Sequence, residues 1–119
     1  MILSIIIPLY NEQNNILIVL DQLLKTEFPS HLEGLEFVIV DDHSADDSYN
    51  VVKEYITDKS MFRLFRHEVN MGKGAAVKTG ISHARGDVFL VQDSDLELSP
   101  SDIPAMVNAM KELDVQFIN

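Results

Sequence analysis

Short apolar runs alternate with stretches of helical periodicity along this chain, and this alternation restricts the possible folds more than any other sequence feature. The apolar runs are Ile2–Pro8, Glu36–Val40, Phe62–Phe65 and Asp87–Val91. They are mostly apolar and β-branched with little polar alternation, which is typical of parallel strands that are buried on both faces. The pattern predicts a layered α/β domain with right-handed crossovers and a mostly parallel sheet of about four or five strands.

Helices are predicted between and after these strands, from apolar residues at helical spacing. The pattern is carried by Ile16, Leu20, Leu23 and Leu24, then Val52, Tyr55 and Ile56, then Ala76, Gly80, Ile81 and Ala84, and last Ile103, Met106, Val107, Met110 and Leu113. Ser44–Asp47 resembles a capping box, so the second helix is expected to begin there. The predicted core contains Ile5, Ile7, Leu20, Leu23, Val38, Val40, Leu64, Ala76, Ile81, Phe89, Val91, Met106 and Met110.

A fifth apolar run, Val115–Ile118, comes immediately before the last residue, Asn119. We interpret the chain as a truncated domain that stops on its fifth strand. The alternative is a complete small domain that ends on an edge strand. An unpaired edge exposes backbone and apolar groups, so self-association into a homo-oligomer is expected.

The composition excludes several classes of protein. A chain of 119 residues suits one domain, and a hydrophobic content of 46% excludes wholesale disorder. The net charge of −10 argues against broad binding to nucleic acid or to an anionic membrane. The absence of cysteine excludes disulfides and thiolate chemistry. With no secretory signal and no apolar run near the about 20 residues that span a bilayer, we expect a cytoplasmic protein.

Polar or acidic segments follow the predicted strands, at Pro8–Glu12, Asp41–Ser44, Asn70–Gly74 and Gln92–Glu97. In open parallel sheets, ligands bind beyond the carboxyl ends of the strands. These segments are therefore expected to line one cleft.

The sharpest of these signals is the pair Asp93 and Asp95, two carboxylates just past a buried strand that can converge on one Mg²⁺ or Mn²⁺. Glu97 can add a further ligand. The alternative is a solvated acidic turn that caps the next helix.

The other segments are open to more than one interpretation. Asp41 and Asp42 can accept hydrogen bonds from a base or ribose, or simply cap a helix. The glycine-rich stretch Asn70–Gly74 places Lys73 where a helix N-terminus favours phosphate, although a plain tight turn also fits. It matches neither the Walker pattern nor the dinucleotide G-x-G-x-x-G, because Gly74 follows the lysine and Val77 stands at the third glycine position.

Taken together, these segments resemble the family 2 glycosyltransferases, which have the GT-A fold, a Rossmann-like α/β/α fold of nucleotide-diphospho-sugar transferases. The matching stretches are SIIIPLYNE (4–12), FVIVDDHSADDS (37–48), NMGKGAAVKTGISHARGD (70–87) and VQDSDLELSPSDIP (91–104). NMGKGAA and QDSDLE are most similar to the polyprenyl-phosphate and dolichyl-phosphate mannose and glucose synthases. The resemblance implies that residues 1–119 are the N-terminal, nucleotide-sugar-binding part of a GT-A domain.

The resemblance also implies roles for individual residues. The implied substrate-binding residues are Pro8, Tyr10, Asn11, Glu12, Asp41, Asp42, Asn70, Gly72, Lys73, Gly74 and Asp93, and the implied ligands of Mg²⁺ or Mn²⁺ are Asp93, Asp95 and Glu97. His43 stands where the family usually has glycine, and Glu97 where the most similar subfamily often has glutamine. The catalytic base follows the D-x-D motif in this family, so it is expected beyond residue 119.

The implied reaction is an inverting transfer of a hexose from UDP-glucose or GDP-mannose to an acceptor. A polyprenyl phosphate is the expected acceptor, because it is already anionic and needs little general-base help; a saccharide hydroxyl is the other candidate. The full-length parent would then work at the cytosolic face of a membrane, in cell-envelope or glycolipid synthesis. Its membrane contact is expected through the missing C-terminal part.

Other functions remain open at this point. The chain can be a donor-binding fragment without a complete catalytic apparatus. A Mg²⁺-dependent phosphohydrolase with an aspartate nucleophile also uses D-x-D, but there the motif follows the first strand rather than the fourth. A receiver-like binding module needs a lone acceptor aspartate after a central strand, which fits this layout poorly.

Overall fold

The computed structural model describes residues 1–94 and shows alternating strands and helices in the predicted order. The elements are β1 (Ile2–Leu9), α1 (Ile16–Lys25), β2 (Gly34–Asp41), α2 (Ser48–Tyr55), β3 (Phe62–Arg66), α3 (Lys73–His83) and β4 (Val88–Val91). The fourth helix and the fifth strand of the prediction lie outside the described residues. No described helix has the length and apolar character needed to cross a membrane.

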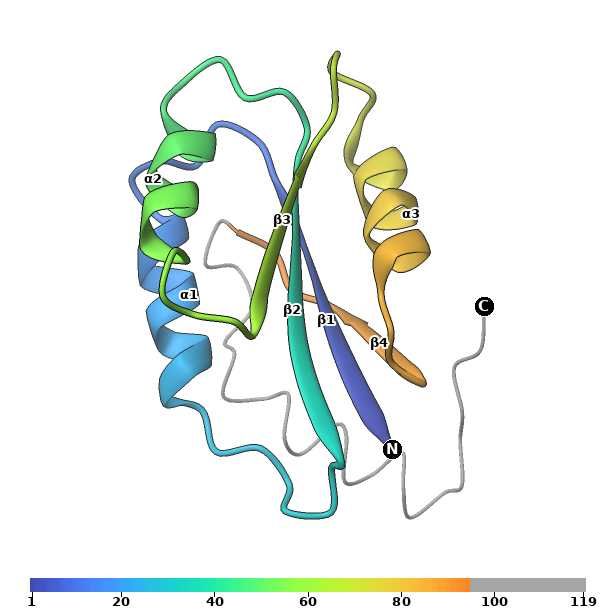
Figure 1. Ribbon diagram of the computed structural model, residues 1–119. Coiled ribbons are helices and arrows are strands. Elements are labelled where there is room, and N and C mark those ends of the chain that lie inside the picture. The colour runs from blue at the N-terminus through green and yellow to red at the C-terminus, as the bar shows by residue number, and fades with distance from the viewer. Residues whose placement is uncertain (95–119) are drawn as a thin grey trace.

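The strands form one parallel sheet in the order β3-β2-β1-β4, with β1 in its centre. Figure 1 shows α1 and α2 on one face of this sheet and α3 on the other. The predicted three-layer α/β/α architecture is therefore confirmed. Parallel strands need helical crossovers, which explains why helices cover both faces.

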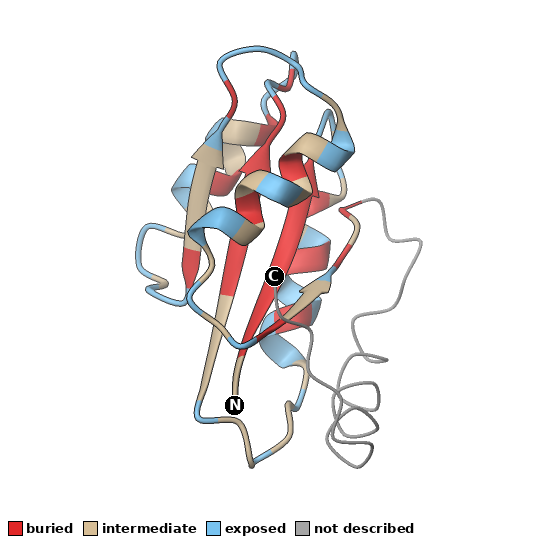
Figure 2. Cartoon of the chain, turned by 90° about the vertical axis from the view of Figure 1, so that its right-hand side faces the viewer, coloured by how far each residue is buried: buried red, intermediate tan, exposed pale blue. Residues whose placement is uncertain are grey.

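The strand residues divide into two cores according to the face on which they lie. On the α1 and α2 side, Leu3, Ile5 and Ile7 of β1 belong to a cluster with apolar residues of α1 and α2. On the α3 side, a smaller cluster contains Ile6, Val38, Val40 and Ala76. Figure 2 shows this burial concentrated in the central strands, with exposed residues on the outer helix surfaces and in loops. The larger core reaches Leu9 at the carboxyl end of β1, and polar side chains follow in the loops beyond the strands.

The predicted core is confirmed for the central strands and the helix faces that pack on them, and it is wrong for Val91 on the edge strand β4. Ile5, Ile7, Leu20, Leu23, Val38, Val40 and Ala76 are buried, Leu64, Ile81 and Phe89 are partly buried, and Met106 and Met110 lie outside the described residues. Val91 is 42% exposed. Its partner in the ladder is Ile6, which faces α3, but α3 packs mainly on β1 and β2 and leaves this end of β4 uncovered within residues 1–94.

The predicted start of the second helix is also wrong, because α2 begins at Ser48 rather than within Ser44–Asp47. The Ser44 hydroxyl donates to Asp41 instead of capping the helix. A capping serine accepts helix N–H groups with its oxygen, and here the Ser44 oxygen accepts the backbone N–H of Asn11 instead.

Two glycines of α3 give a matched test of this packing. A Cβ on Gly80 would stand 2.5 Å from Cγ2 of Ile6, whereas a Cβ on Gly74 meets nothing within 4 Å. Gly80→Ala should lower the free energy of unfolding by about 1–3 kcal/mol through overpacking. Gly74→Ala should leave it unchanged or raise it by up to about 1 kcal/mol through helix propensity. Urea unfolding of both variants measures this, and an equal effect at both positions would contradict the packing described here.

Candidate functional site

The candidate site lies at the carboxyl ends of β1 and β4, where the strand order reverses. The chain adds β2 and β3 on one side of β1 and then places β4 on the other side. In open parallel sheets, such a reversal is the place where ligands bind. A pocket of about 310 Å³ lies there, a size typical of small-molecule sites. It is lined by Pro8, Leu9, Tyr10, Glu12, Asp42, Asn70, Gly72, Lys73, Ala76, Asp93 and Ser94.

Most of the residues singled out in the sequence come together at this pocket. Pro8, Tyr10, Glu12, Asp42, Asn70, Gly72, Lys73 and Asp93 line it. Asn11, Asp41 and Gly74 do not belong to its lining, and Asp95 and Glu97 lie outside the described residues. The lining also includes Leu9, Ala76 and Ser94, which no sequence motif indicated.

Asp42 connects the end of β2 to the loop before α3. Its carboxylate accepts hydrogen bonds from the backbone N–H groups of Met71 and Gly72, both at 2.8 Å, and from the Asn70 amide at 3.1 Å. The ring of His67 adds a fourth contact at 2.8 Å. Burial by itself would raise the pKa of Asp42, but the bonds from His67, Met71 and Gly72 outweigh it and hold that pKa below its ordinary value.

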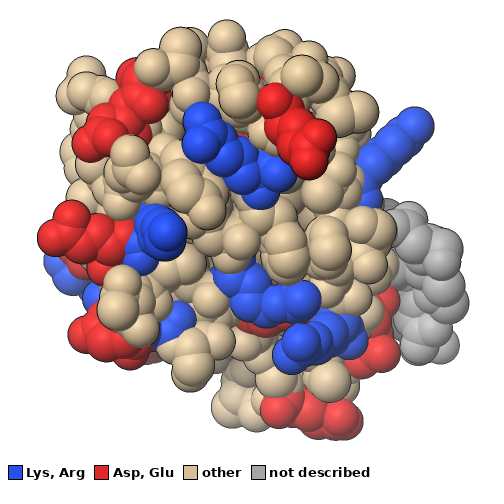
Figure 3. Space-filling model, turned by 45° about the horizontal axis from the view of Figure 1, so that its top comes forward, with Lys and Arg blue, Asp and Glu red and all other residues tan. Residues whose placement is uncertain are grey.

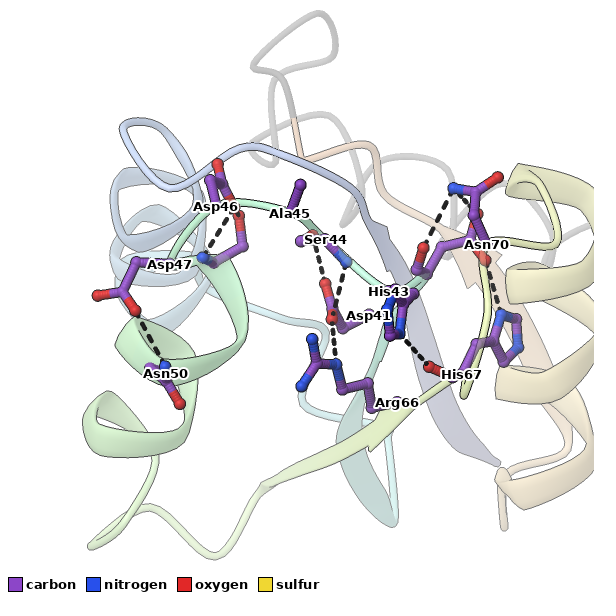
Figure 4. Close-up of polar contacts among 12 residues, drawn as sticks. Asp41, His43, Ser44, Ala45, Asp46, Asp47, Asn50, Arg66, His67 and Asn70 are labelled. Atoms are coloured by element: carbon purple, nitrogen blue, oxygen red, sulfur yellow. Dashed lines mark hydrogen bonds and ion pairs between the residues drawn. The ribbon is translucent and has the colours of Figure 1, made fainter.

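Asp41 is fully buried and faces away from the pocket. Figure 4 shows its carboxylate between Ser44 and Arg66. The hydroxyl and backbone N–H of Ser44 donate to it, and Arg66 Nε lies 3.2 Å from Oδ2. Asp41 therefore fixes the loop after β2, and any effect on a ligand is transmitted through that loop.

Asn11 holds the loop after β1 against the loop after β2. Its side-chain oxygen accepts from the backbone N–H groups of Ala45 at 2.8 Å and Asp46 at 3.3 Å, and its own N–H donates to Ser44. Asn11 and His43 both have positive φ, at 51° and 59°. Position 43 is thus a site that favours glycine, as the departure from the family pattern indicated.

Lys73 and Asp93 face each other across the pocket. The Lys73 ammonium contacts Oδ1 of Asp93, and the Asp93 side chain is 17% exposed. Lys73 is also the first residue of α3, and Gly72 before it has φ of 96°, a conformation that suits glycine. A helix N-terminus and a lysine side chain both favour an anionic ligand here. Within residues 1–94, no three acidic or histidine side chains are close enough to hold a metal together.

The surface around the carboxyl edge carries both signs of charge. Figure 3 shows basic and acidic side chains interspersed on this side of the molecule. The net charge of −10 is therefore not gathered into one acidic face at this edge. An anionic ligand can approach without meeting a field of one repulsive sign.

His67 was missed in the sequence, although it is buried beneath the site. No motif marks it, because the histidine is flanked by exposed Arg66 and Glu68 in a segment without periodicity. The only available signal was its position directly after the third strand, where parallel sheets place functional side chains.

Three comparisons relate this chain to known proteins. The family model described as glycosyl transferase family 2 matches residues 4–118. The dolichol-phosphate mannosyltransferase of Pyrococcus furiosus is 36% identical over 110 residues, which are 91% of this chain and 30% of that protein. The dolichyl-phosphate beta-glucosyltransferase of Saccharomyces cerevisiae is 32% identical over 117 residues, 94% of this chain and 35% of that protein. The chain thus spans about a third of the length of these curated relatives.

Solved structures show the same arrangement of elements. The crystal structure of S. aureus TarS 1-349 in complex with UDP has a TM-score of 0.78 and 29% identity, and the match covers 94% of this chain and 32% of TarS 1-349. The mannosyltransferase PcManGT from Pyrobaculum calidifontis, in complex with GDP-Man and Mn²⁺, has a TM-score of 0.77 and 28% identity over 93% of this chain and 32% of its own.

Removing the charge of Asp42 should destabilise the fold in a pH-dependent way. Asp42→Asn places an amide where four donors converge, so the free energy of unfolding at pH 7 should fall by about 1–3 kcal/mol. A carboxyl with a lowered pKa stabilises the fold above its ordinary pKa, and that stabilisation is lost as the pH falls through the lower, folded-state value. The difference between the wild type and the variant should therefore shrink below about pH 4.

The control is Asp47→Asn, at an exposed position that precedes α2 and where either residue is a suitable helix cap. It should change the free energy of unfolding by less than about 0.5 kcal/mol. Urea unfolding at a series of pH values makes the comparison. A difference for Asp42→Asn that is constant from pH 7 to pH 2 would contradict the assigned network.

Proposed function

The chain belongs to glycosyl transferase family 2, and on this premise we propose that its pocket binds the nucleotide-diphospho-sugar donor of a hexose transfer. The observation that carries the proposal is the pairing of Lys73 and Asp93 at the switch point of the sheet. A donor of this kind needs partners for its diphosphate and for the charge that develops when its glycosidic bond breaks. The structures of TarS with UDP and of PcManGT with GDP-Man support the same class of ligand.

Different residues of the pocket suit different parts of the donor, according to their chemistry. Lys73 and the N-terminus of α3 suit the diphosphate, because the lysine carries a positive charge and the helix dipole has its positive end there. Tyr10 lies at the mouth of the pocket and is 47% exposed, so its ring is available to a base or ribose. Pro8, Glu12, Asn70 and Gly72 complete the proposed contact surface, and Asn11, Asp41 and Gly74 would act by holding it in place.

The residues at the end of β4 fit a divalent cation. The Asp93 side chain stands at the pocket wall, is 17% exposed and contacts the Lys73 ammonium. A divalent cation bound at Asp93 would replace that contact and leave Lys73 to the diphosphate. We propose Asp93, Asp95 and Glu97 as ligands of Mg²⁺ or Mn²⁺, which prefer oxygen donors and share them with phosphates. When bound, the ion would stabilise the negative charge of the diphosphate leaving group.

The proposed acceptor is a polyprenyl phosphate, whose anionic oxygen would attack the anomeric carbon of the donor with inversion while the bond to the nucleoside diphosphate breaks. The names of the Pyrococcus and Saccharomyces relatives support this acceptor class. An acceptor that is already anionic does not require a general base among the described residues. Hexose transfer, its donor and its acceptor are proposals for the protein as a whole, of which this chain represents about a third by comparison with its relatives.

Calorimetry tests donor binding and its dependence on metal. UDP-glucose and GDP-mannose are titrated into the chain with Mg²⁺, with Mn²⁺ and with a chelator, and binding should be strong only with metal. Asp93→Asn and Asp95→Asn should each weaken the metal-dependent binding by about 1–3 kcal/mol, because each removes a charged ligand. Asp47→Asn, an equal substitution outside the pocket, should leave it unchanged. Equal affinity with metal and with chelator would refute the metal role.

A further inference from the structure

His67 is the only buried histidine within residues 1–94, and both of its ring nitrogens are engaged. Nδ1 lies 2.8 Å from Oδ1 of Asp42, and Nε2 lies 2.8 Å from the hydroxyl of Thr79 on α3. Its backbone N–H donates to the carbonyl of Asp41 at 2.9 Å. The residue does not line the pocket, so nothing in the proposed donor contacts explains why its ring is held this tightly.

Asp42 is the connection between His67 and the pocket. The same carboxylate that meets the ring also accepts the N–H groups of Met71 and Gly72. Gly72 is the residue at which the backbone turns into α3, with φ of 96°. The direction of the Asp42 carboxylate therefore decides where the loop at 70–72 and the start of α3 stand.

Thr79 fixes the ring in the orientation that Asp42 needs. An ionised carboxylate can only accept, so Nδ1 must carry a hydrogen to bond with it. A hydroxyl can donate or accept, so Thr79 can bond to Nε2 whether that nitrogen is protonated or not. The ring thus keeps one orientation in both of its charge states, and the link to Asp42 is maintained in each.

We propose that His67 is a positioning residue, which through Asp42 holds the loop at 70–72 in the geometry that receives the donor. The loop's geometry can be measured without any ligand. The effect on donor affinity rests on the function proposed above.

Two substitutions at His67 separate this role from simple filling of space. The amide nitrogen of asparagine stands near the place of Nδ1 and can still donate to Asp42, whereas that of glutamine reaches toward the place of Nε2 and Thr79. In His67→Gln, the backbone amides of Met71 and Gly72 should exchange with solvent faster than in the wild type. In His67→Asn, their exchange rates should remain close to those of the wild type.

Donor affinity should follow the same order. His67→Gln should weaken binding of the better of UDP-glucose and GDP-mannose about tenfold, the effect of losing a hydrogen bond to a charged group. His67→Asn should stay within about threefold of the wild type. A second pair acts on the same ring from the other side. Thr79→Val removes the bond that orients the ring but keeps Nδ1, so it should change the amides and the affinity in the direction of His67→Gln and by less. Thr79→Ser, which keeps the hydroxyl, should resemble the wild type.

Amide exchange by NMR and calorimetry on the full 119-residue chain decide the outcome. Unchanged exchange rates of the Met71 and Gly72 amides in His67→Gln would overturn the positioning role. So would equal losses of donor affinity in His67→Asn and His67→Gln that follow the free energies of unfolding of the two variants. If His67→Gln does not fold, the Thr79 pair gives the same decision. If the amides respond as expected but the wild type binds neither nucleotide-sugar, the proposed function fails and the positioning of the loop stands.

Discussion

The burial of β1 is the constraint on which the rest of the structure depends. This strand pairs in parallel with β2 on one edge and with β4 on the other, and from Leu3 to Leu9 every residue is buried. A strand enclosed in this way has no free face or edge for a ligand. Any chemistry must therefore lie beyond its carboxyl end, and the pocket is found where Pro8 and Leu9 leave the sheet.

The acidic residues at this edge have two different surroundings. Asp41 and Asp42 are buried and accept hydrogen bonds from the protein itself, so their charges hold loops in place. The Asp93 carboxylate lies at the pocket wall and contacts the Lys73 ammonium. The charge at the end of β2 is thus engaged by backbone and side-chain donors of the protein, whereas the charge at the end of β4 forms an ion pair at the pocket wall. This division agrees with the view that a preorganised site needs supporting residues as well as contact residues.

The interlocking of loops explains how a small α/β unit can keep a defined site. Asn11 bonds to the backbone at 45 and 46, and Asp42 bonds to the backbone at 71 and 72. The loops after β1, β2 and β3 are therefore tied to one another by side chains, in addition to the backbone bonds from Asp42 to Leu9 and from His67 to Asp41. Asn11 has a positive φ of 51°, and the bonds that it makes to Ser44, Ala45 and Asp46 compensate for this strained backbone.

Hydrophobic periodicity allowed the strands and the helices on both faces to be predicted, and the motifs that follow the strands allowed the family to be predicted, because all of these are local features of the sequence. Periodicity could not predict that Val91 is exposed, since that depends on how far α3 extends across the sheet. It also could not show that Ser44 bonds to Asp41 instead of capping α2, because both partners were equally plausible along the chain.

The sequence by itself determined that polar segments gather at one edge of a parallel sheet, because strand direction and alternation are local properties. Only the tertiary structure decided which of their carboxylates face the pocket and which are turned inward. It also decided that His67, just after β3, and Thr79, twelve residues later on α3, form one hydrogen-bond network with Asp42. The physical reason is that a buried carboxylate must take its hydrogen bonds from whichever donors packing brings within reach, and packing is a property of the whole fold.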